Sequence, residues 1–218
     1  MSDKRQYIID ALSMQESWRL FKIMAEIVDG FDTLSDVKRG VSIFGSARTA
    51  PGDPLYEETA DLGRLLAQNG YSIITGGGKG VMEAANKGAK EAGGESIGLH
   101  IELPLEKAPN EFLNKRVDFK YFFVRKLMFI KYACAYVVMP GGFGTLDEFF
   151  EALVLTQTHR IKPFPIILYK RDYWAGLMDW INDRLIEHAH ISSDDLSLIE
   201  VVDEPGEVVS YIRKHVIV

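Results

Sequence analysis

From Gly40 onward, short apolar segments alternate with segments of helical periodicity, and this alternation most constrains the fold. The apolar segments are VSIFG, YSIITGG, SIGLHI, FKYFFV, YVVMPGG, FPIILY and LIEVV. Helices are predicted over residues 55–69, 81–92, 125–133, 145–158, 173–189 and 205–215. Strands that alternate with helices form βαβ units, and strands that are apolar throughout are covered on both faces. The sequence therefore predicts an α/β fold with a mostly parallel sheet of about seven strands and helices on both faces.

An amphipathic helix precedes the first strand. Between Gln15 and Asp32, apolar residues recur at steps of three and four, which is the stripe of such a helix. The stripe does not distinguish packing on the domain from packing on a partner subunit. Because 218 residues suffice for one well-buried α/β core and are few for two, we expect a single domain over residues 1–218, with 1–40 as a helical extension.

Composition excludes several classes of protein. A net charge of −6 disfavours a nucleic-acid surface, which is usually basic. The first residues lack the apolar core of a signal peptide and no stretch is long enough to span a bilayer, so we expect a cytoplasmic protein without a membrane partner. Cys134, the only cysteine, rules out an internal disulfide. His188 and His190 lack a further ligand at metal-binding spacing, so no metal site is expected.

Three of the predicted strands lead directly into glycine-rich turns, FGSAR, TGGGKG and PGGFGT. Ligands of open parallel sheets bind beyond the carboxyl ends of the strands, so these turns are expected to meet in one crevice. Glycine lets backbone N–H groups approach a ligand, and a following helix favours an anion such as phosphate. A tight turn that simply needs glycine is the alternative. The candidate ligand-binding residues are Gly45, Ser46, Gly77, Gly78, Gly80, Gly141, Gly142, Gly144 and Thr145.

The second glycine turn matches neither of two common nucleotide motifs. TGGGKGVMEAAN lacks the lysine followed by Ser or Thr that a nucleoside triphosphatase loop requires. It also departs from the GxGxxG pattern of dinucleotide-binding proteins. ATP hydrolysis and nicotinamide cofactors are therefore disfavoured, and Lys79 is equally compatible with a phosphate contact and with an ordinary loop lysine.

Charged residues follow two of the strands. Asp147 and Glu148 lie in the first turn of a predicted helix, where a carboxylate is stabilised by the helix dipole. Neighbouring helical residues point about 100° apart, so one of the two is expected to face the crevice. Arg125 and Lys126 begin another helix, where a positive charge is unfavourable and needs compensation.

The segments PGGFGTLDE, GGGKGVMEAANKGA and VRKLMF resemble the motifs of the LOG-type cytokinin riboside 5′-monophosphate phosphoribohydrolases, formerly labelled lysine decarboxylases. The resemblance extends from about Val41 to Val202, and PGGFGTLDE matches the family's PGGxGTxxE motif. It implies a Rossmann-like fold, no cofactor, and a homodimer or higher homo-oligomer. It also implies hydrolysis of the N-glycosidic bond of a nucleoside 5′-monophosphate to a free base and ribose 5-phosphate.

The same resemblance implies roles for individual residues. Arg125 and Glu148 stand at the family's catalytic positions, and the glycines of PGGFGT with Thr145 stand where it binds phosphate. Lys126 and, in a loop that departs from the plant pattern, Glu106 are further substrate-binding candidates. A carboxylate would stabilise the cation that forms on ribose or orient a water. Because a guanidinium does not deprotonate, Arg125 is expected to keep Glu148 ionised and to position the substrate.

Other functions stay open at this point. The main alternative is a non-catalytic carrier of a nucleotide or of molybdenum cofactor, which has no need for the Arg125 and Glu148 pair. A lysine decarboxylase would need pyridoxal phosphate on a lysine with a partner for the pyridinium nitrogen, and no such set is visible. A DNA-binding relative of the same fold would need a basic face. Sequence does not distinguish a prenylated adenine from plain AMP or GMP as the preferred base.

Overall fold

The computed structural model describes residues 16–102 and 108–216. The strands are β1 (Gly40–Phe44), β2 (Ser72–Thr75), β3 (Ser96–Ile101), β4 (Lys115–Phe119), β5 (Ala133–Val138), β6 (Ile166–Tyr169) and β7 (Ile199–Val202). The α-helices are α1 (Glu16–Thr33), α2 (Pro54–Gln68), α3 (Val81–Glu91), α4 (Phe122–Tyr132), α5 (Phe143–Gln157), α6 (Arg171–Trp180) and α7 (Pro205–His215). The strands form one seven-stranded sheet in which every pair is parallel, which confirms the predicted fold class.

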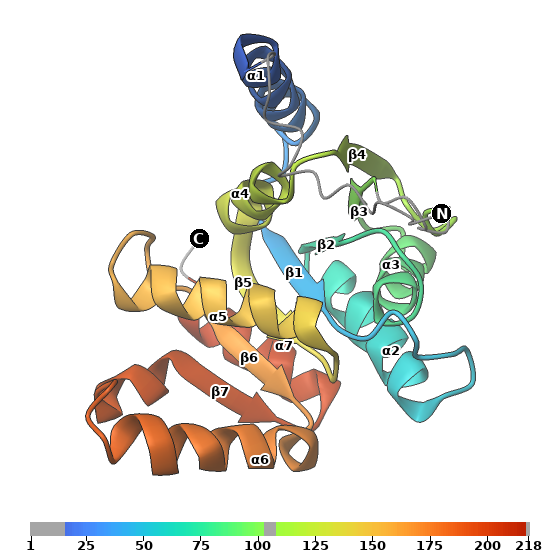
Figure 1. Ribbon diagram of the computed structural model, residues 1–218. Helices are drawn as coiled ribbons and strands as arrows, with labels where there is room; N and C mark the ends of the chain where they lie inside the picture. Colours follow the sequence, from blue (N-terminus) through green and yellow to red (C-terminus); the bar gives the residue numbers. More distant parts are fainter. Residues whose placement is uncertain (1–15, 103–107, 217–218) are drawn as a thin grey trace, which may run out of the picture.

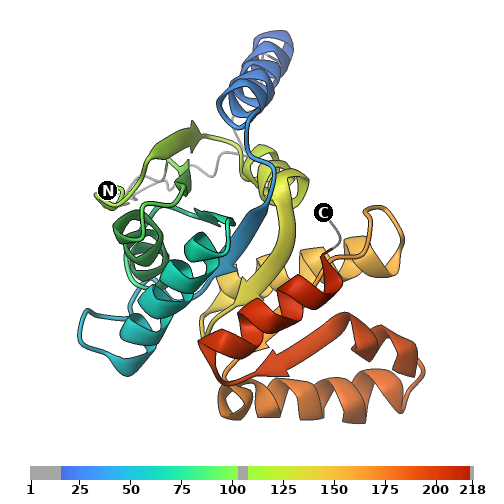
Figure 2. The ribbon, with the colours of Figure 1, turned by 180° about the vertical axis from the view of Figure 1, so that it is seen from behind.

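Helices cover both faces of this sheet (Figures 1 and 2). Helices α4, α5 and α6 pack on one face over a core that contains Phe129, Phe149 and Trp174. Helices α2, α3 and α7 pack on the other face over a core that contains Leu62 and Ile212. Because both faces are covered, the inner strands β1, β3 and β6 are buried along their whole length.

The strand order places a topological switch at the centre of the sheet. In the order β4-β3-β2-β1-β5-β6-β7, the chain runs outward from β1 in one direction and then from β5 in the other. At such a point the two neighbouring connections leave on opposite faces and a crevice opens beyond the strand ends. The glycine turns after β1 and β5 are therefore neighbours at this crevice, with the turn after β2 beside them.

The prediction that FKYFFV forms a strand is wrong. The strand ends at Phe119, and the following aromatic residues begin helix α4 at Phe122. The segment KRVDF forms the edge strand β4 instead, in which Val117 and Phe119 are buried and Arg116 and Asp118 are exposed. An edge strand needs apolar side chains on only one face, so its charged residues masked it in a search for apolar runs.

Two other helices differ in extent from their predictions. The helix predicted over 173–189 is α6, which ends at Trp180 and continues as a short π-helical segment, Ile181–Ile186. The predicted helix 125–133 begins three residues earlier, at Phe122. Among residues 16–102 and 108–216, no helix is long and apolar enough to cross a membrane.

Helix α1 extends away from the rest of the chain in both ribbon views (Figures 1 and 2). Its inner side packs on the domain through Ile23 and Ile27, and the carboxylate of Glu26 accepts hydrogen bonds from the backbone N–H groups of Lys120 and Tyr121. Its outer side carries exposed apolar residues, so only part of the amphipathic stripe is used within one chain. The exposed residues are Trp18, Leu20, Phe21, Met24, Val28 and Phe31.

Helices α2 and α3 cross so closely that only glycine fits at the contact. A Cβ atom on Gly88 would clash with the backbone carbonyl of Ala60, and one on Gly63 would clash with that of Ala85. Neither obstacle is a flexible side chain that can rotate away. The glycines therefore set the distance between the two helices.

We predict that Gly88→Ala lowers the free energy of unfolding by about 1–3 kcal/mol, as overpacking does in close-packed interiors. Gly176→Ala is the matched control, because its Cβ would meet nothing within 4 Å on helix α6. It should leave stability unchanged or raise it by up to about 1 kcal/mol. Denaturant titration of both variants tests this, and equal stabilities would contradict it.

Candidate functional site

A cavity of about 790 Å³ lies at the switch point between β1 and β5, within the usual size range of small-molecule sites. All three turns contribute to its wall: Gly45 and Ser46 after β1, Gly76 after β2, and Pro140 to Thr145 after β5. Arg125 of α4 and Glu148 of α5 also line it. The predicted convergence of the glycine turns is confirmed. The remaining lining residues are Phe44, Ala47, Arg48, Leu55, Met82, Phe122, Asp147 and Tyr173.

The backbone of Ser46 joins the three turns. Its N–H donates to the carbonyl of Pro140 at 3.0 Å, and its carbonyl accepts from the N–H of Val81 at 3.0 Å. Gly80, at φ +70°, makes the second bond possible, because a Cβ there would collide with the Ser46 carbonyl. Gly80 does not line the cavity, so the structure gives it a packing role that its motif did not indicate.

Helix α5 begins at the cavity. Its N-cap is Gly142, which has no side chain to bond the first N–H groups of the helix. The helix starts at Phe143, so Thr145 lies inside the first turn, and Asp147 and Glu148 lie in the second turn and not in the first as predicted. The hydroxyl of Thr145 packs against Gly141, where any Cβ would displace it. An uncapped helix start at a cavity suits an anion.

Gly77 and Gly78 are held from behind by buried amides and do not line the cavity. Asn110 donates from its backbone N–H to the Gly77 carbonyl at 2.8 Å and from its side-chain amide to the Gly78 carbonyl at 2.9 Å. The same amide donates to the side chain of Asn86, which accepts from Thr75 at 2.6 Å. This network fixes the turn after β2, and the isolated asparagines carried no sequence signal for it.

Gly76 sets the position of Arg125. A Cβ on Gly76 would collide with the Nη2 atom of Arg125 and lie 2.7 Å from the sulfur of Met82. Arg125 is anchored by a hydrogen bond from Nε to the Leu99 carbonyl, 2.8 Å, and its guanidinium lies 5.3 Å from the ring centre of Phe129. The guanidinium thus passes over the turn after β2 to reach the cavity.

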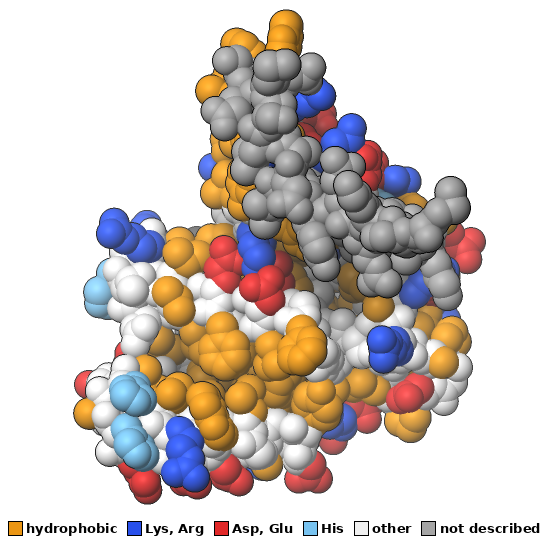
Figure 3. All heavy atoms as spheres, in the orientation of Figure 1, with side chains coloured by type: hydrophobic (Ala, Val, Ile, Leu, Met, Phe, Trp, Pro, Cys, Tyr) orange, Lys and Arg blue, Asp and Glu red, His pale blue; other side chains and the backbone are white. Residues whose placement is uncertain are grey.

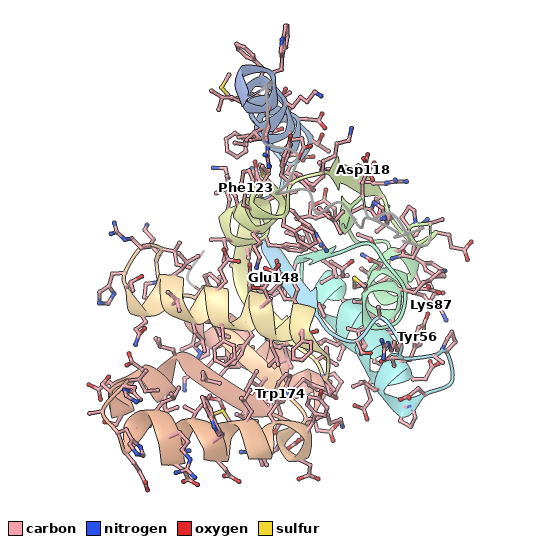
Figure 4. All side chains as sticks on the ribbon, viewed as in Figure 1. Tyr56, Lys87, Asp118, Phe123, Glu148 and Trp174 are labelled. Atoms are coloured by element: carbon pink, nitrogen blue, oxygen red, sulfur yellow. The ribbon has the colours of Figure 1, made fainter. Side chains whose placement is uncertain are left out.

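Glu148 is the buried carboxylate of the site (Figure 4), with 8% of its surface exposed. Its Oε1 lies 3.2 Å from the ammonium of Lys126, and its buried Oε2 has no hydrogen-bond partner among the described residues. Burial raises the pKa of this carboxyl above its ordinary value, while Lys126 and, less strongly, Arg125 act to lower it. Both adjacent acids line the cavity, but only Glu148 is buried, since the side chain of Asp147 is 61% exposed.

Lys126, expected to contact the substrate, is instead surrounded by carboxylates. It does not line the cavity, and its ammonium lies 2.7 Å from Glu151, 2.9 Å from Asp147 and 3.2 Å from Glu148. The nearest cation to Glu148 is therefore Lys126, where the sequence favoured Arg125. These carboxylates also supply the compensation expected for a positive charge at the start of α4. Sequence could not show that Glu151, one turn further along α5, belongs to the cluster.

Two lining residues carry chemistry that the motifs did not indicate. Arg48 lines the cavity and donates its backbone N–H to the hydroxyl of Ser46 at 3.1 Å. Tyr173 of α6 donates its hydroxyl to the Gly141 carbonyl at 2.7 Å and so braces the PGGFGT turn.

Lys79 pairs with Glu83 at 2.8 Å. Glu106 lies outside the described residues. Over the part of the chain that is described, no group of three or more His, Cys, Asp or Glu side chains is placed to hold a metal ion.

A sequence profile for a family described as "Possible lysine decarboxylase" matches residues 82–212, more than half of the chain. The PGGFGTLDE motif, Arg125 and Glu148 lie inside this match, whereas Gly45 and Ser46 lie before it. The chain belongs to this family, the LOG family.

Relatives and solved structures agree with this membership. The chain is 29% identical over 156 residues to the cytokinin riboside 5′-monophosphate phosphoribohydrolase of Mycobacterium tuberculosis, covering 68% of this chain and 80% of that protein. An X-ray structure of TM1055, a structural genomics target, is 28% identical with a TM-score of 0.62, covering 81% and 99%. The molybdenum cofactor binding protein of Rippkaea orientalis is 22% identical with a TM-score of 0.60, covering 81% and 96%, which shows the shared fold.

We predict that Glu148→Gln stabilises the protein at neutral pH. A carboxyl whose folded pKa is raised contributes stability below its unfolded pKa, and this contribution is lost as pH rises through the folded pKa. Replacing it by a neutral amide should raise the Tm at pH 7.5 by roughly 2–4 °C, the effect of about 1 kcal/mol in a chain of this size. The difference should shrink toward pH 4. Glu187→Gln, at an exposed position, is the control and should show no such trend in calorimetry. A Glu148→Gln protein less stable than wild type at both pH values would contradict this reading.

Proposed function

We propose that this LOG-family protein hydrolyses the N-glycosidic bond of nucleoside 5′-monophosphates and releases a free base and ribose 5-phosphate. The observation that carries the proposal is the buried Oε2 of Glu148, which has no hydrogen-bond partner in residues 16–102 and 108–216, beside a cavity at the uncapped start of α5. An anion site and a fixed carboxylate in one cavity match a substrate with phosphate at one end and a developing sugar cation next to it. The phosphoribohydrolase names of the relatives support the same reaction class.

In this proposal the phosphate lies at the start of α5. Gly142 and Gly144 leave room for it, since a Cβ on either would meet no atom within 4 Å, and Gly141 lets the hydroxyl of Thr145 approach the turn. The helix dipole favours an anion there by roughly 0.3–2 kcal/mol. The hydroxyl groups of Thr145 and Ser46 are further donors toward the same group.

The sugar then faces Glu148. As the bond from C1′ to the base nitrogen breaks, positive charge develops on the ribose and the carboxylate stabilises it. A water adds its oxygen to C1′, one of its protons passes to Glu148 or solvent, and the base leaves with the bonding electrons and takes up a proton. Arg125 stays protonated and acts by orienting the departing base and strengthening the charge of the site.

The cavity does not fit the lysine decarboxylase chemistry in the family description. That reaction requires a lysine to form a Schiff base with pyridoxal phosphate. Arg48 and Arg125 are the basic residues that line the cavity within the described parts of the chain. Lys126, behind Glu148, is engaged by carboxylates. The residues present therefore offer no suitable nitrogen, and the description does not define the reaction.

The proposal is tested by incubating the purified protein with AMP, GMP and isopentenyl-AMP and measuring free base and ribose 5-phosphate by chromatography. We expect release from at least one nucleotide, and a loss on the order of 10²–10³ in kcat for Glu148→Gln or Arg125→Met, as for a preorganised electrostatic group. Glu187→Gln is the control and should match wild type. Tight nucleotide binding without turnover by the folded protein would instead indicate a carrier.

We further propose that two copies associate through the exposed apolar side of α1 and the adjoining part of α4. Nine large side chains there, 36–68% exposed, would supply most of the roughly 800 Å² that each partner contributes to a standard interface. A helix that is apolar on two sides is usually covered on both. The α4 side chains are Phe122, Phe123 and Leu127.

We predict that Phe21→Glu combined with Val28→Glu converts the dimer to a monomer in sedimentation velocity, because burying two carboxylates in an apolar contact is costly. Lys22→Glu alters charge on the same helix at an exposed polar position and is the control that should remain dimeric. A wild-type monomer, or a double variant that still dimerises, would overturn the assignment.

A further inference from the structure

Consecutive basic residues at the start of α4 point to different parts of the molecule. Arg125 passes over Gly76 to the cavity, and Lys126 reaches carboxylates in the second and third turns of α5. Figure 3 shows acidic and basic side chains gathered over α5 beside hydrophobic ones. The two cations therefore have separate tasks, although the sequence places them side by side.

The ammonium of Lys126 is fully used by its neighbours. It has three N–H donors, and three carboxylates lie within 2.7–3.2 Å of it, from Asp147, Glu148 and Glu151. Its side chain is only 16% exposed. No donor is left for a substrate phosphate, so a direct substrate contact would require Lys126 to give up one of its partners.

The three carboxylates differ in what they can do if this cation is lost. The side chains of Asp147 and Glu151 are 61% and 32% exposed, so both can turn toward water. Glu148, at 10% side-chain exposure, cannot. Three carboxylates around one point repel one another, and the buried member is the one that gains most from binding a proton.

We propose that Lys126 is a positioning residue that holds Glu148 by Oε1, keeps it ionised and leaves Oε2 to face the reacting sugar. This rests on the proposed role of Glu148 in nucleotide hydrolysis. Lys126 contacts Oε1 of Glu148, and the other carboxylate oxygen, the buried Oε2, has no partner among the described residues. Lys126 acts through Glu148 and does not touch the substrate.

The charge environment of Glu148 comes from three elements. Lys126 and Arg125 on α4 lower its pKa, and Glu151 on α5 raises it, while burial has the largest effect and raises it. Asp147 shares Lys126 with it. The hydroxyl of Tyr136 on β5 is also buried, and burial raises the pKa of this hydroxyl. The charges of Glu148 and Glu151 raise the Tyr136 pKa further. Lys126 is therefore the strongest influence that favours the charged carboxylate.

Two substitutions should shift the pKa of the Glu148 carboxyl in opposite directions. Lys126→Met keeps much of the side-chain length without charge, and should raise the pKa of Glu148. Glu151→Gln removes a repelling charge and frees Lys126 for Glu148, and should lower that pKa. Carbon-13 NMR titration of glutamate carboxyls in the free protein measures this directly, with the Glu148 signal identified by its loss in Glu148→Gln. Lys38→Met, at an exposed position before β1, is the control.

Kinetics supply the second measurement. We expect Lys126→Met to lower kcat about 10- to 100-fold, as loss of a partner that orients a functional group does, with KM nearly unchanged. The pH profile of kcat should also change. In Lys126→Met its acid limb should move to higher pH, and in Glu151→Gln the acid limb should move to lower pH. Lys126→Arg should recover part of the rate because it retains the charge.

These outcomes separate the inference from the proposed reaction. An unchanged Glu148 titration in Lys126→Met, or a large rise in KM with kcat intact, overturns the positioning role even if the protein hydrolyses nucleotides. Absence of hydrolysis by wild type overturns the reaction, while the NMR titration still decides whether Lys126 controls the charge of Glu148. If Lys126→Met does not fold, the opposite shift in Glu151→Gln decides it.

Discussion

The backbone of Ser46 is the point at which the ends of three strands are held together. One N–H and one carbonyl of this residue bind the turns after β5 and β2, so the walls of the cavity are fixed relative to one another by main-chain bonds. Such bonds need close backbone approach, and the glycines at 80 and 141 allow it because a Cβ at either position would press against Ser46. Every later feature, from the start of α5 to the reach of Arg125, is placed relative to this junction.

The same junction explains why a costly carboxylate is tolerated. Glu148 is carried into the protein by the second turn of α5, a helix that starts where the PGGFGT backbone meets Ser46. A buried carboxylate is destabilising unless it is paired. Lys126 pairs with one oxygen, and the other remains without a partner among the described residues. Polar groups left unpaired at a cavity are typical of sites that bind or act on a ligand, where stability is given up for function.

Sequence reasoning succeeded where a local pattern controls the outcome. Inner strands such as SIGLHI are buried on both faces and therefore apolar, and residues 205–215 form a helix with the predicted limits. It failed at β4, because an edge strand is covered on one face and KRVDF carries charges on the other. It also gave Gly77, Gly78 and Gly80 a ligand-binding role, whereas in the structure Gly76 lines the cavity and its neighbours pack against Asn110 and Ser46.

By itself, the sequence determined the α/β class, the meeting of the glycine turns at one sheet edge and the placement of an acid behind the PGGFGT turn. These follow from periodicity and from the direction of parallel strands, which are local properties of the chain. Only the tertiary structure decided which cation serves Glu148, since Lys126, Glu148 and Glu151 come together because α4 and α5 lie on the same face of the sheet. It alone showed that α1 uses one side of its apolar stripe, because burial depends on what the rest of the fold places against a helix.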